Sequence, residues 1–173
     1  MELKFRTLEA SEIDVRVQSA RAEGVILLLY KDARCDMNIL DEAVGVTNWK
    51  REHCVVNNNL FCTVSIWDEA KGQWITKQDV GTESKTEQEK GQASDSFKRA
   101  CVNWGIGREL YTAPLIWVPA SRCKNFNNRN NHYSCTDRFE VSHIAYDEHR
   151  RIKELEIKNL TLKAAAYSFG GNK

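Results

Sequence analysis

Alternating apolar and polar positions in the middle of the chain predict three consecutive β-strands. At residues 60–67 the apolar positions recur every second residue, at Leu60, Cys62, Val64 and Ile66, the period that places one set of side chains on each face of a strand. Similar segments precede it at residues 49–56 and follow it at residues 73–80. The first connection, Asn57-Asn58-Asn59, suits a tight turn because Asn tolerates positive φ. We therefore expect an antiparallel meander.

A helical period follows the meander. Apolar positions spaced by three or four residues form one stripe, at Ala93, Phe97, Ala100, Cys101 and Trp104. Residues 86–89 fit a capping box and Gly105 marks the far end. We expect this long amphipathic helix to lie across the even-numbered face of the meander. The predicted fold class is therefore α+β, with a βββα core.

The flanking segments predict further elements. Ser11 fits a capping box, and Ile13, Val17 and Ala20 then recur at helical spacing, so we expect a helix over residues 11–20 that Gly24 ends. Residues 25–30 read as a buried strand. Asp36 is expected to cap a second helix, with Met37, Leu40 and Val44 on one side and Gly45 at its end.

The C-terminal third predicts a hairpin after a polar loop. Residues 121–136 are Asn-rich, as is typical of a ligand-facing loop. Residues 139–146 and 152–162 alternate apolar and polar side chains and are expected to form a C-terminal hairpin over 139–162. Residues 168–173 read as a terminal fringe. We expect a single domain over 1–173, with a core at about 11–111.

Composition and charge limit the function classes. The chain has 173 residues, 25 Lys or Arg against 24 Asp or Glu, and a net charge of +1. This balance excludes a histone-like polycation and leaves room for a local basic stripe. The longest apolar run, residues 25–30, is far too short to cross a bilayer, and no apolar signal region follows Met1. We expect a cytoplasmic protein with no membrane partner.

Two adjacent cations on the long helix are the strongest candidate for a binding site. Lys98 and Arg99 flank the apolar stripe and could hold two phosphates of one strand, Lys as a point charge and Arg as a fork. Asp95 offers the alternative, since it precedes them by three and four residues and could form ion pairs on the helix surface. Arg108 follows Gly105-Ile106-Gly107 as a basic neighbour of the helix end.

Two other chemistries have weaker patterns. Cys123, His132 and Cys135 could supply three zinc ligands, but they lack the Cys-x-x-Cys pair of structural sites, so we expect free thiols, no metal and no cofactor. Asp79, Glu83 and Lys85 have the acid…acid-x-Lys spacing of metal-dependent nucleases. We retain the nuclease as the alternative function. A Walker phosphate loop is absent, which argues against ATP hydrolysis.

The order of these motifs resembles one family. Gly-x3-Trp at residues 45–49, the meander, Val80-Gly81, the Asp-x-x-Lys-Arg-Ala run at 95–100 and Gly-x-Gly at 105–107 are similar to the single-strand annealing proteins of the Rad fifty-two / Rad twenty-two type, including phage Sak annealases. The similarity extends from about Ser11 to Tyr111. A lysine that the family carries in the meander has no counterpart at residues 57–60, so an outer DNA site is not implied.

The resemblance implies a function and a set of residues. It implies ATP-independent binding and annealing of single-stranded DNA in recombination or repair, by a homo-oligomeric ring and without enzymatic catalysis. The DNA-binding residues it implies are Lys98, Arg99, Arg16 in the expected first helix and Lys85. Arg108, the basic neighbour of the helix end, is added to these candidates from its position. A host or phage recombination or replication protein is a further expected partner. Compact size favours a phage or prophage protein acting in a bacterium.

Overall fold

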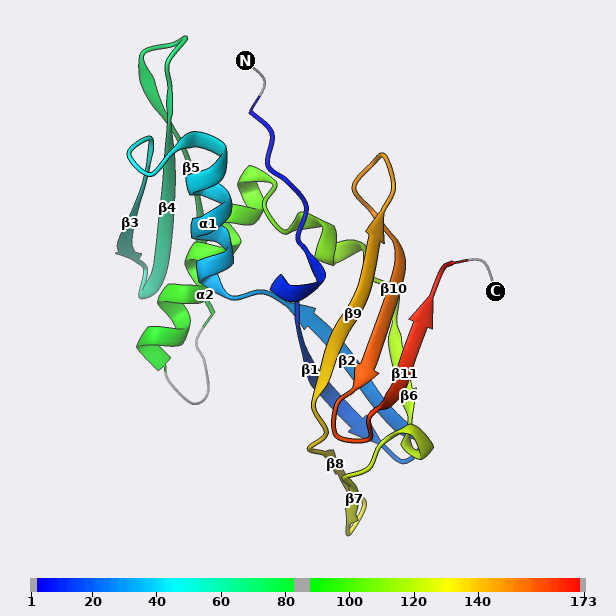
Figure 1. Cartoon of the computed structure of the whole chain (residues 1–173). Coiled ribbons are helices and arrows are strands. Elements are labelled where there is room, and N and C mark those ends of the chain that lie inside the picture. Colours follow the sequence, from blue (N-terminus) through cyan, green and yellow to red (C-terminus); the bar gives the residue numbers. More distant parts are fainter. Residues whose placement is uncertain (1–2, 83–87, 172–173) are drawn as a thin grey trace. The chain divides into compact units, whose positions relative to one another are not determined.

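The computed structural model describes residues 3–82 and 88–171, with the backbone alone for residues 88–90 (Figure 1). The chain forms two compact units, Met1–Thr7 with Ala33–Arg108 and Leu8–Asp32 with Glu109–Lys173. Helices and mostly antiparallel strands occur together, so the predicted α+β class is confirmed. The single domain over 1–173 stays a prediction. Among the described residues, no helix combines the length and apolar character needed to span a membrane.

The first unit is a three-stranded antiparallel sheet with two helices. Its strand order is β3-β4-β5. The strands expected at residues 49–56, 60–67 and 73–80 are confirmed, and the full set of elements is α1 (Ala33–Val44), β3 (Trp49–Val56), β4 (Asn59–Asp68), β5 (Gln73–Val80) and α2 (Gln88–Trp104). Asn57 and Asn58 have φ values of 50° and 61°, as expected for the tight turn between β3 and β4.

The start of helix α1 differs from the sequence prediction, whereas the end of helix α2 agrees with it. Helix α1 begins at Ala33, three residues before the expected cap, and Asp36 is instead fully buried within its first turn. Helix α2 ends where expected, because Gly105 adopts a φ of 98° that other residues rarely reach. The amide of Ile106 then bonds to the carbonyl of Cys101 at 3.1 Å and closes the last turn.

The second unit is a six-stranded sheet with the order β11-β10-β9-β1-β2-β6. The sheet is nearly closed and barrel-like in outline, since the Tyr167 hydroxyl near one edge donates to the Leu115 carbonyl oxygen near the other at 3.3 Å (Figure 1). Fully buried apolar side chains such as Val25, Val118 and Leu155 fill its core. The strands are β1 (Asp14–Arg21), β2 (Gly24–Tyr30), β6 (Ile116–Pro119), β9 (Phe139–Tyr146), β10 (Ile152–Asn159) and β11 (Ala164–Phe169).

The helix predicted over residues 11–20 is wrong. Only the one-turn 3-10 helix η1 (Ala10–Glu12) forms there, and the chain continues as β1, paired with β2 from Asp14 opposite Tyr30 to Arg21 opposite Gly24. Val15 and Val17 alternate with exposed polar residues, so the segment fits a strand period as well as a helical one. Pairing with the apolar strand β2 decides between the two periods.

The C-terminal region contains more strands than the pattern predicts. The strands β9 and β10 pair as expected, but they belong to the six-stranded sheet and are not a separate C-terminal hairpin. Strand β11 occupies part of the expected fringe. The expected loop at 121–136 holds a small hairpin, and the remaining short elements are η2 (Arg108–Thr112), η3 (Ala120–Arg122), β7 (Phe126–Arg129) and β8 (His132–Cys135).

Candidate nucleic-acid interface

Helix α2 packs on the sheet through its apolar stripe. Phe97, Ala100 and Cys101 are fully buried, and the Phe97 ring stacks on Trp49 of β3 with centroids 6.1 Å apart. The Arg51 guanidinium lies over the Phe97 ring, 4.8 Å from its centroid. The Trp104 indole donates to the Val64 carbonyl at 3.1 Å. Because these contacts bury one face of α2, its charged residues lie on the flanks of the helix.

The Val80-Gly81-Thr82 segment at the end of β5 packs closely against the backbone of α2. A Cβ at Gly81 would overlap the carbonyl oxygen of Gln92 and lie 2.8 Å from the amide nitrogen of Ser96. The Thr82 amide and hydroxyl both donate to the Asp95 carboxylate, at 2.9 and 3.0 Å. Asp95 therefore binds the segment before α2, and its carboxylate makes none of the ion pairs with Lys98 or Arg99 that the sequence left open.

Lys98 and Arg99 occupy different flanks of α2. Arg99 leans toward β5, where its Nε lies 3.4 Å from Asp79 Oδ1, and its side chain is 42% exposed. Lys98 is half-buried and makes no ion pair or hydrogen bond with the described residues. Adjacent helical residues point about 100° apart. The two side chains therefore point in different directions from α2 and do not form a single binding pair.

Asp79 serves as an acceptor for its neighbours. Its Oδ1 accepts the Val80 amide at 2.7 Å as well as Arg99, and its Oδ2 accepts the Asn103 side chain at 3.3 Å. Glu83 and Lys85, the other residues of the nuclease alternative, lie outside the described residues. A cation at Asp79 would have to replace these hydrogen bonds, so the geometry at this position favours a structural role.

Of the other predicted DNA-binding residues, Arg108 and Arg16 have local partners, and Lys85 lies outside the described residues. Arg108 is exposed, but its guanidinium donates to the carbonyl oxygens of Val102 and Asn103 at 2.8–3.1 Å and so caps the end of α2. Arg16 lies on β1 of the second unit, where it is exposed and 5.7 Å from the Tyr30 ring centroid. The expectation that Arg16 sits on a first helix is wrong because this segment is a strand.

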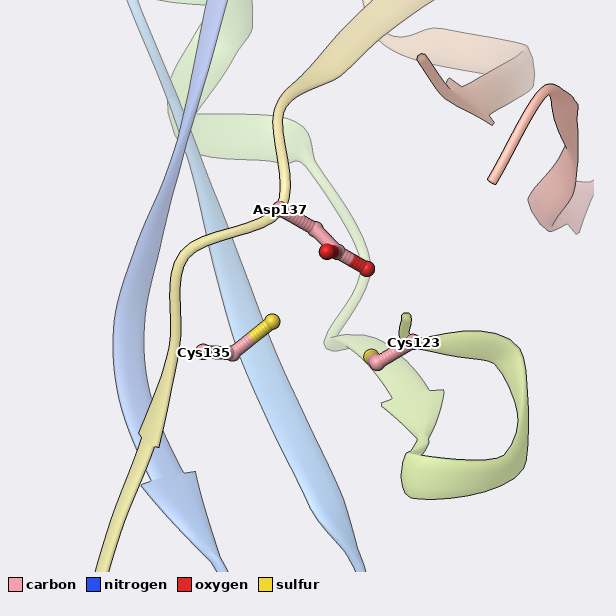
Figure 2. A group of neighbouring side chains, drawn as sticks. All are labelled: Cys123, Cys135 and Asp137. Carbon is pink, nitrogen blue, oxygen red and sulfur yellow. The ribbon is translucent and has the colours of Figure 1, made fainter. Parts of the chain in front are cut away.

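Cys123, Cys135 and Asp137 form the cluster that Figure 2 shows. Their ligand atoms lie within 4.8 Å of one another, and His132 belongs to no such group in the described part of the chain. Burial, and next the nearby Cys135, raise the pKa of the Cys123 thiol to about 12, which keeps it protonated at neutral pH. Both Asp137 oxygens accept hydrogen bonds, from Lys124, Asn125 and Asn159. The carboxylate thus already has partners without a metal.

The sequence missed the hairpin of β7 and β8. Asn130 and Asn131 have φ values of 52° and 63°, the same turn conformation as the Asn pair between β3 and β4. The repeated Asn-Asn pair was the available signal. It was hidden because the flanking strands have only four residues each and alternate weakly.

No family model and no solved structure matches the chain. A stretch of 102 residues, 58% of the chain, is 36% identical to the single-stranded DNA-binding protein DdrA of Deinococcus radiodurans. The match covers 48% of DdrA, so the chain spans about half the length of this curated relative.

Proposed function

We propose that this protein binds single-stranded DNA and anneals complementary strands without ATP and without bond-breaking chemistry. The observation that carries the proposal is the 36% identity, over 102 residues, to a protein named for single-stranded DNA binding. The finer assignment, to annealing proteins of the Rad fifty-two / Rad twenty-two type, rests on the order of the motifs along α2 and the meander.

The proposed contact is between the flanks of α2 and the phosphate backbone. Lys98 has no partner among the described residues to displace, and the Arg99 guanidinium touches Asp79 through Nε alone at 3.4 Å. The remaining donors of the Arg99 fork are available to a phosphate. Holding the backbone leaves the bases free to pair and reduces the repulsion between two strands.

A ring would supply the affinity that a chain of net charge +1 lacks. Repeating a small basic surface around an assembly converts weak contacts into avid binding. Strands β3 and β5 are the two edges of their sheet, and exposed edges can pair head to tail between copies and close into a ring. Light scattering tests this part: a strict monomer at micromolar concentration, with and without DNA, would contradict it.

The proposed setting is homologous recombination or repair in the bacterial cytoplasm, with phage or prophage origin as the expected source. A host or phage recombination or replication protein is the proposed protein partner. These assignments follow from the motif resemblance, and the nucleic-acid assays below test the activity itself.

A strand-annealing assay tests the activity and separates it from the nuclease alternative. Complementary labelled strands are incubated with the protein in EDTA and without ATP, and duplex formation is followed over time. We expect duplex to form faster than in the protein-free control. Cleavage that appears only with Mg²⁺, without annealing in EDTA, would replace this proposal by the nuclease that uses Asp79, Glu83 and Lys85.

A further inference from the structure

The β7–β8 region is the most one-sided part of the chain in charge. Residues 121–136 contain three Lys or Arg and no Asp or Glu, whereas the whole chain has 25 against 24. The same segment holds five Asn residues. Arg, Lys, Asn and Ser side chains are the usual donors to phosphate oxygens in nucleic-acid complexes. The segment therefore combines positive charge with neutral donors and includes no carboxylate that would repel a phosphate.

The hairpin has two chemically different faces. Phe126 pairs with Cys135 and Asn128 with Tyr133, so these residues share one face, where the Phe126 and Tyr133 rings lie 6.1 Å apart and are half-buried. The opposite face presents only exposed polar side chains, which are Asn127, Arg129, His132 and Ser134. The aromatic pair stiffens the ribbon while the polar face is open to solvent.

The hairpin is held firmly at its tip and at its base. At the tip, the Asn131 amide donates to Asn128 Oδ1 at 3.0 Å. At the base, the buried Asp137 carboxylate accepts the backbone amides of Lys124 and Asn125 at 2.6 and 2.9 Å. Asn159, which is fully buried, donates to the same carboxylate at 2.6 Å. A ribbon fixed at both ends loses little conformational entropy when it binds.

Two cations, Arg129 on β7 and Lys124 two residues before β7, are available to a ligand. Arg129 and Lys124 are exposed, and neither side chain has a hydrogen bond or ion pair with the described residues. Arg99 and Arg108, in contrast, donate to Asp79 and to helix carbonyls. Figure 1 shows the hairpin projecting beyond the end of the six-stranded sheet of its own unit. A ligand can therefore contact the hairpin without contacting the rest of the six-stranded sheet.

We propose that the β7–β8 hairpin is a nucleic-acid contact that grips the phosphate backbone through Arg129, Lys124 and the polar face. The inference rests on the proposed function, since it assigns a second contact on the same chain to DNA. The ligand is a polyanionic phosphodiester chain, chosen because the hairpin complements its charge and its acceptors. Both an unpaired strand and the annealed duplex carry this backbone.

Fluorescence anisotropy with a labelled oligothymidylate and with a labelled duplex tests the contact across a salt series. The double variant Arg129→Ala, Lys124→Ala should bind about tenfold more weakly, because each lost contact is a charge-assisted hydrogen bond. On single strands, the slope of log affinity against log salt should flatten by roughly 0.7 for each lost contact. Loss on one probe only identifies whether single strand or duplex is held.

The double variant Lys153→Ala, Lys158→Ala is the matched control, because it removes two exposed cations from β10 of the same unit. It should stay within about twofold of wild type. A hairpin double variant that binds both probes as this control does, with the same salt slope as the control, overturns the hairpin contact while leaving the proposed function intact. Wild-type protein that binds neither probe overturns both. Circular dichroism of each variant checks that the fold is retained.

Discussion

Two cationic surfaces of this protein differ in how far their charges are used internally. On the flanks of α2, Arg99 pairs with Asp79 and Arg108 caps the helix end, so that of the three cations Lys98 alone has no partner among the described residues. Near the β7–β8 hairpin, Arg129 and Lys124 make no side-chain hydrogen bond or ion pair within the described structure, and the Lys124 charge acts internally only by helping to lower the pKa of Asp137. A basic run in the sequence therefore identifies the charge, but the contacts across strands and helix ends decide how much of it can meet a ligand.

Gly81→Ala should disrupt the packing between the end of β5 and α2 and leave the β7–β8 hairpin unaffected. The new Cβ would overlap backbone atoms of α2, which cannot move as a side-chain end can. We expect unfolding free energy to fall by about 3 kcal/mol or more, as overpacking against backbone does. Urea denaturation measures it. Gly72→Ala is the control, since Gly72 has open space around it and a φ of 61°, and should cost only about 1–2 kcal/mol.

Replacing Lys98 and Arg99 together by Ala tests the α2 surface as a DNA contact. The buried stripe is untouched, so melting should change by no more than about 0.5 kcal/mol. Affinity for single strands should fall about tenfold, independently of sequence, because two charge-assisted contacts to the backbone are lost. The salt slope should flatten by about 1.4. Normal melting with unchanged affinity, annealing and salt slope would show that α2 is not the contact.

Asp137→Asn tests how the hairpin is anchored. Burial would raise the pKa of Asp137, but hydrogen bonds from Asn159, Lys124 and Asn125 outweigh it, and the pKa lies below its ordinary value. The carboxylate therefore stabilises the fold above pH about 4, the unfolded value, and this stability is lost as pH falls through the folded pKa. We expect Asp137→Asn to cost about 2 kcal/mol at pH 7, because an amide cannot accept all three bonds.

The difference in unfolding free energy between wild type and Asp137→Asn should shrink as pH falls below about 4. Using the difference removes the contributions of the acids that both proteins share. If this difference in unfolding free energy stays constant from pH 7 to pH 3, the charge of Asp137 does not stabilise the base of the hairpin.

The sequence predicts elements well where one period dominates and poorly where two periods compete. The strands of the meander and α2 follow from strong periods, and Asn57 and Gly105 adopt the positive φ values that their residue types suggest. Residues 11–20 satisfy a helical and a strand period together, and only pairing with β2 decides. Local propensity carries no information on that long-range partner.

For the candidate site, residue types are visible in the sequence and their partners are not. Lys98 and Arg99 are found from their position beside the apolar stripe. The link between Asp95 and Thr82, 13 residues apart, and the pair of Arg99 with Asp79, 20 residues apart, depend on how β5 meets α2. The Asp137 cluster likewise unites three short segments that no spacing rule connects.

Asp95→Asn should have a smaller effect than the loss of the cations themselves. An Asn keeps an oxygen acceptor for Thr82 but removes a negative charge from the surface of α2. Stability should fall by no more than about 1 kcal/mol, and single-strand affinity should rise slightly as repulsion of the phosphates decreases. Anisotropy and urea denaturation measure the two effects. Weaker binding at unchanged stability would mean that Asp95 itself contributes to the DNA contact.

The smallest expected effect is a gain of function at Asp79. Asp79→Asn keeps one oxygen acceptor, which serves the Val80 amide, and loses the acceptor for the Asn103 side chain. It also removes the charge that pairs with Arg99, whose Nε lies 3.4 Å from Asp79 Oδ1. Surface pairs of this kind contribute at most about 1 kcal/mol, so a freed Arg99 should bind single strands only about two- to threefold more tightly. The matched control is Glu52→Gln, which removes the same charge from a pair of equal length with Lys50 on β3 of the same sheet. If Asp79→Asn raises the affinity for single strands more than Glu52→Gln does, the ion pair with Asp79 limits how strongly Arg99 binds DNA. Equal gains would assign the effect to net charge and remove the distinction drawn between α2 and the hairpin.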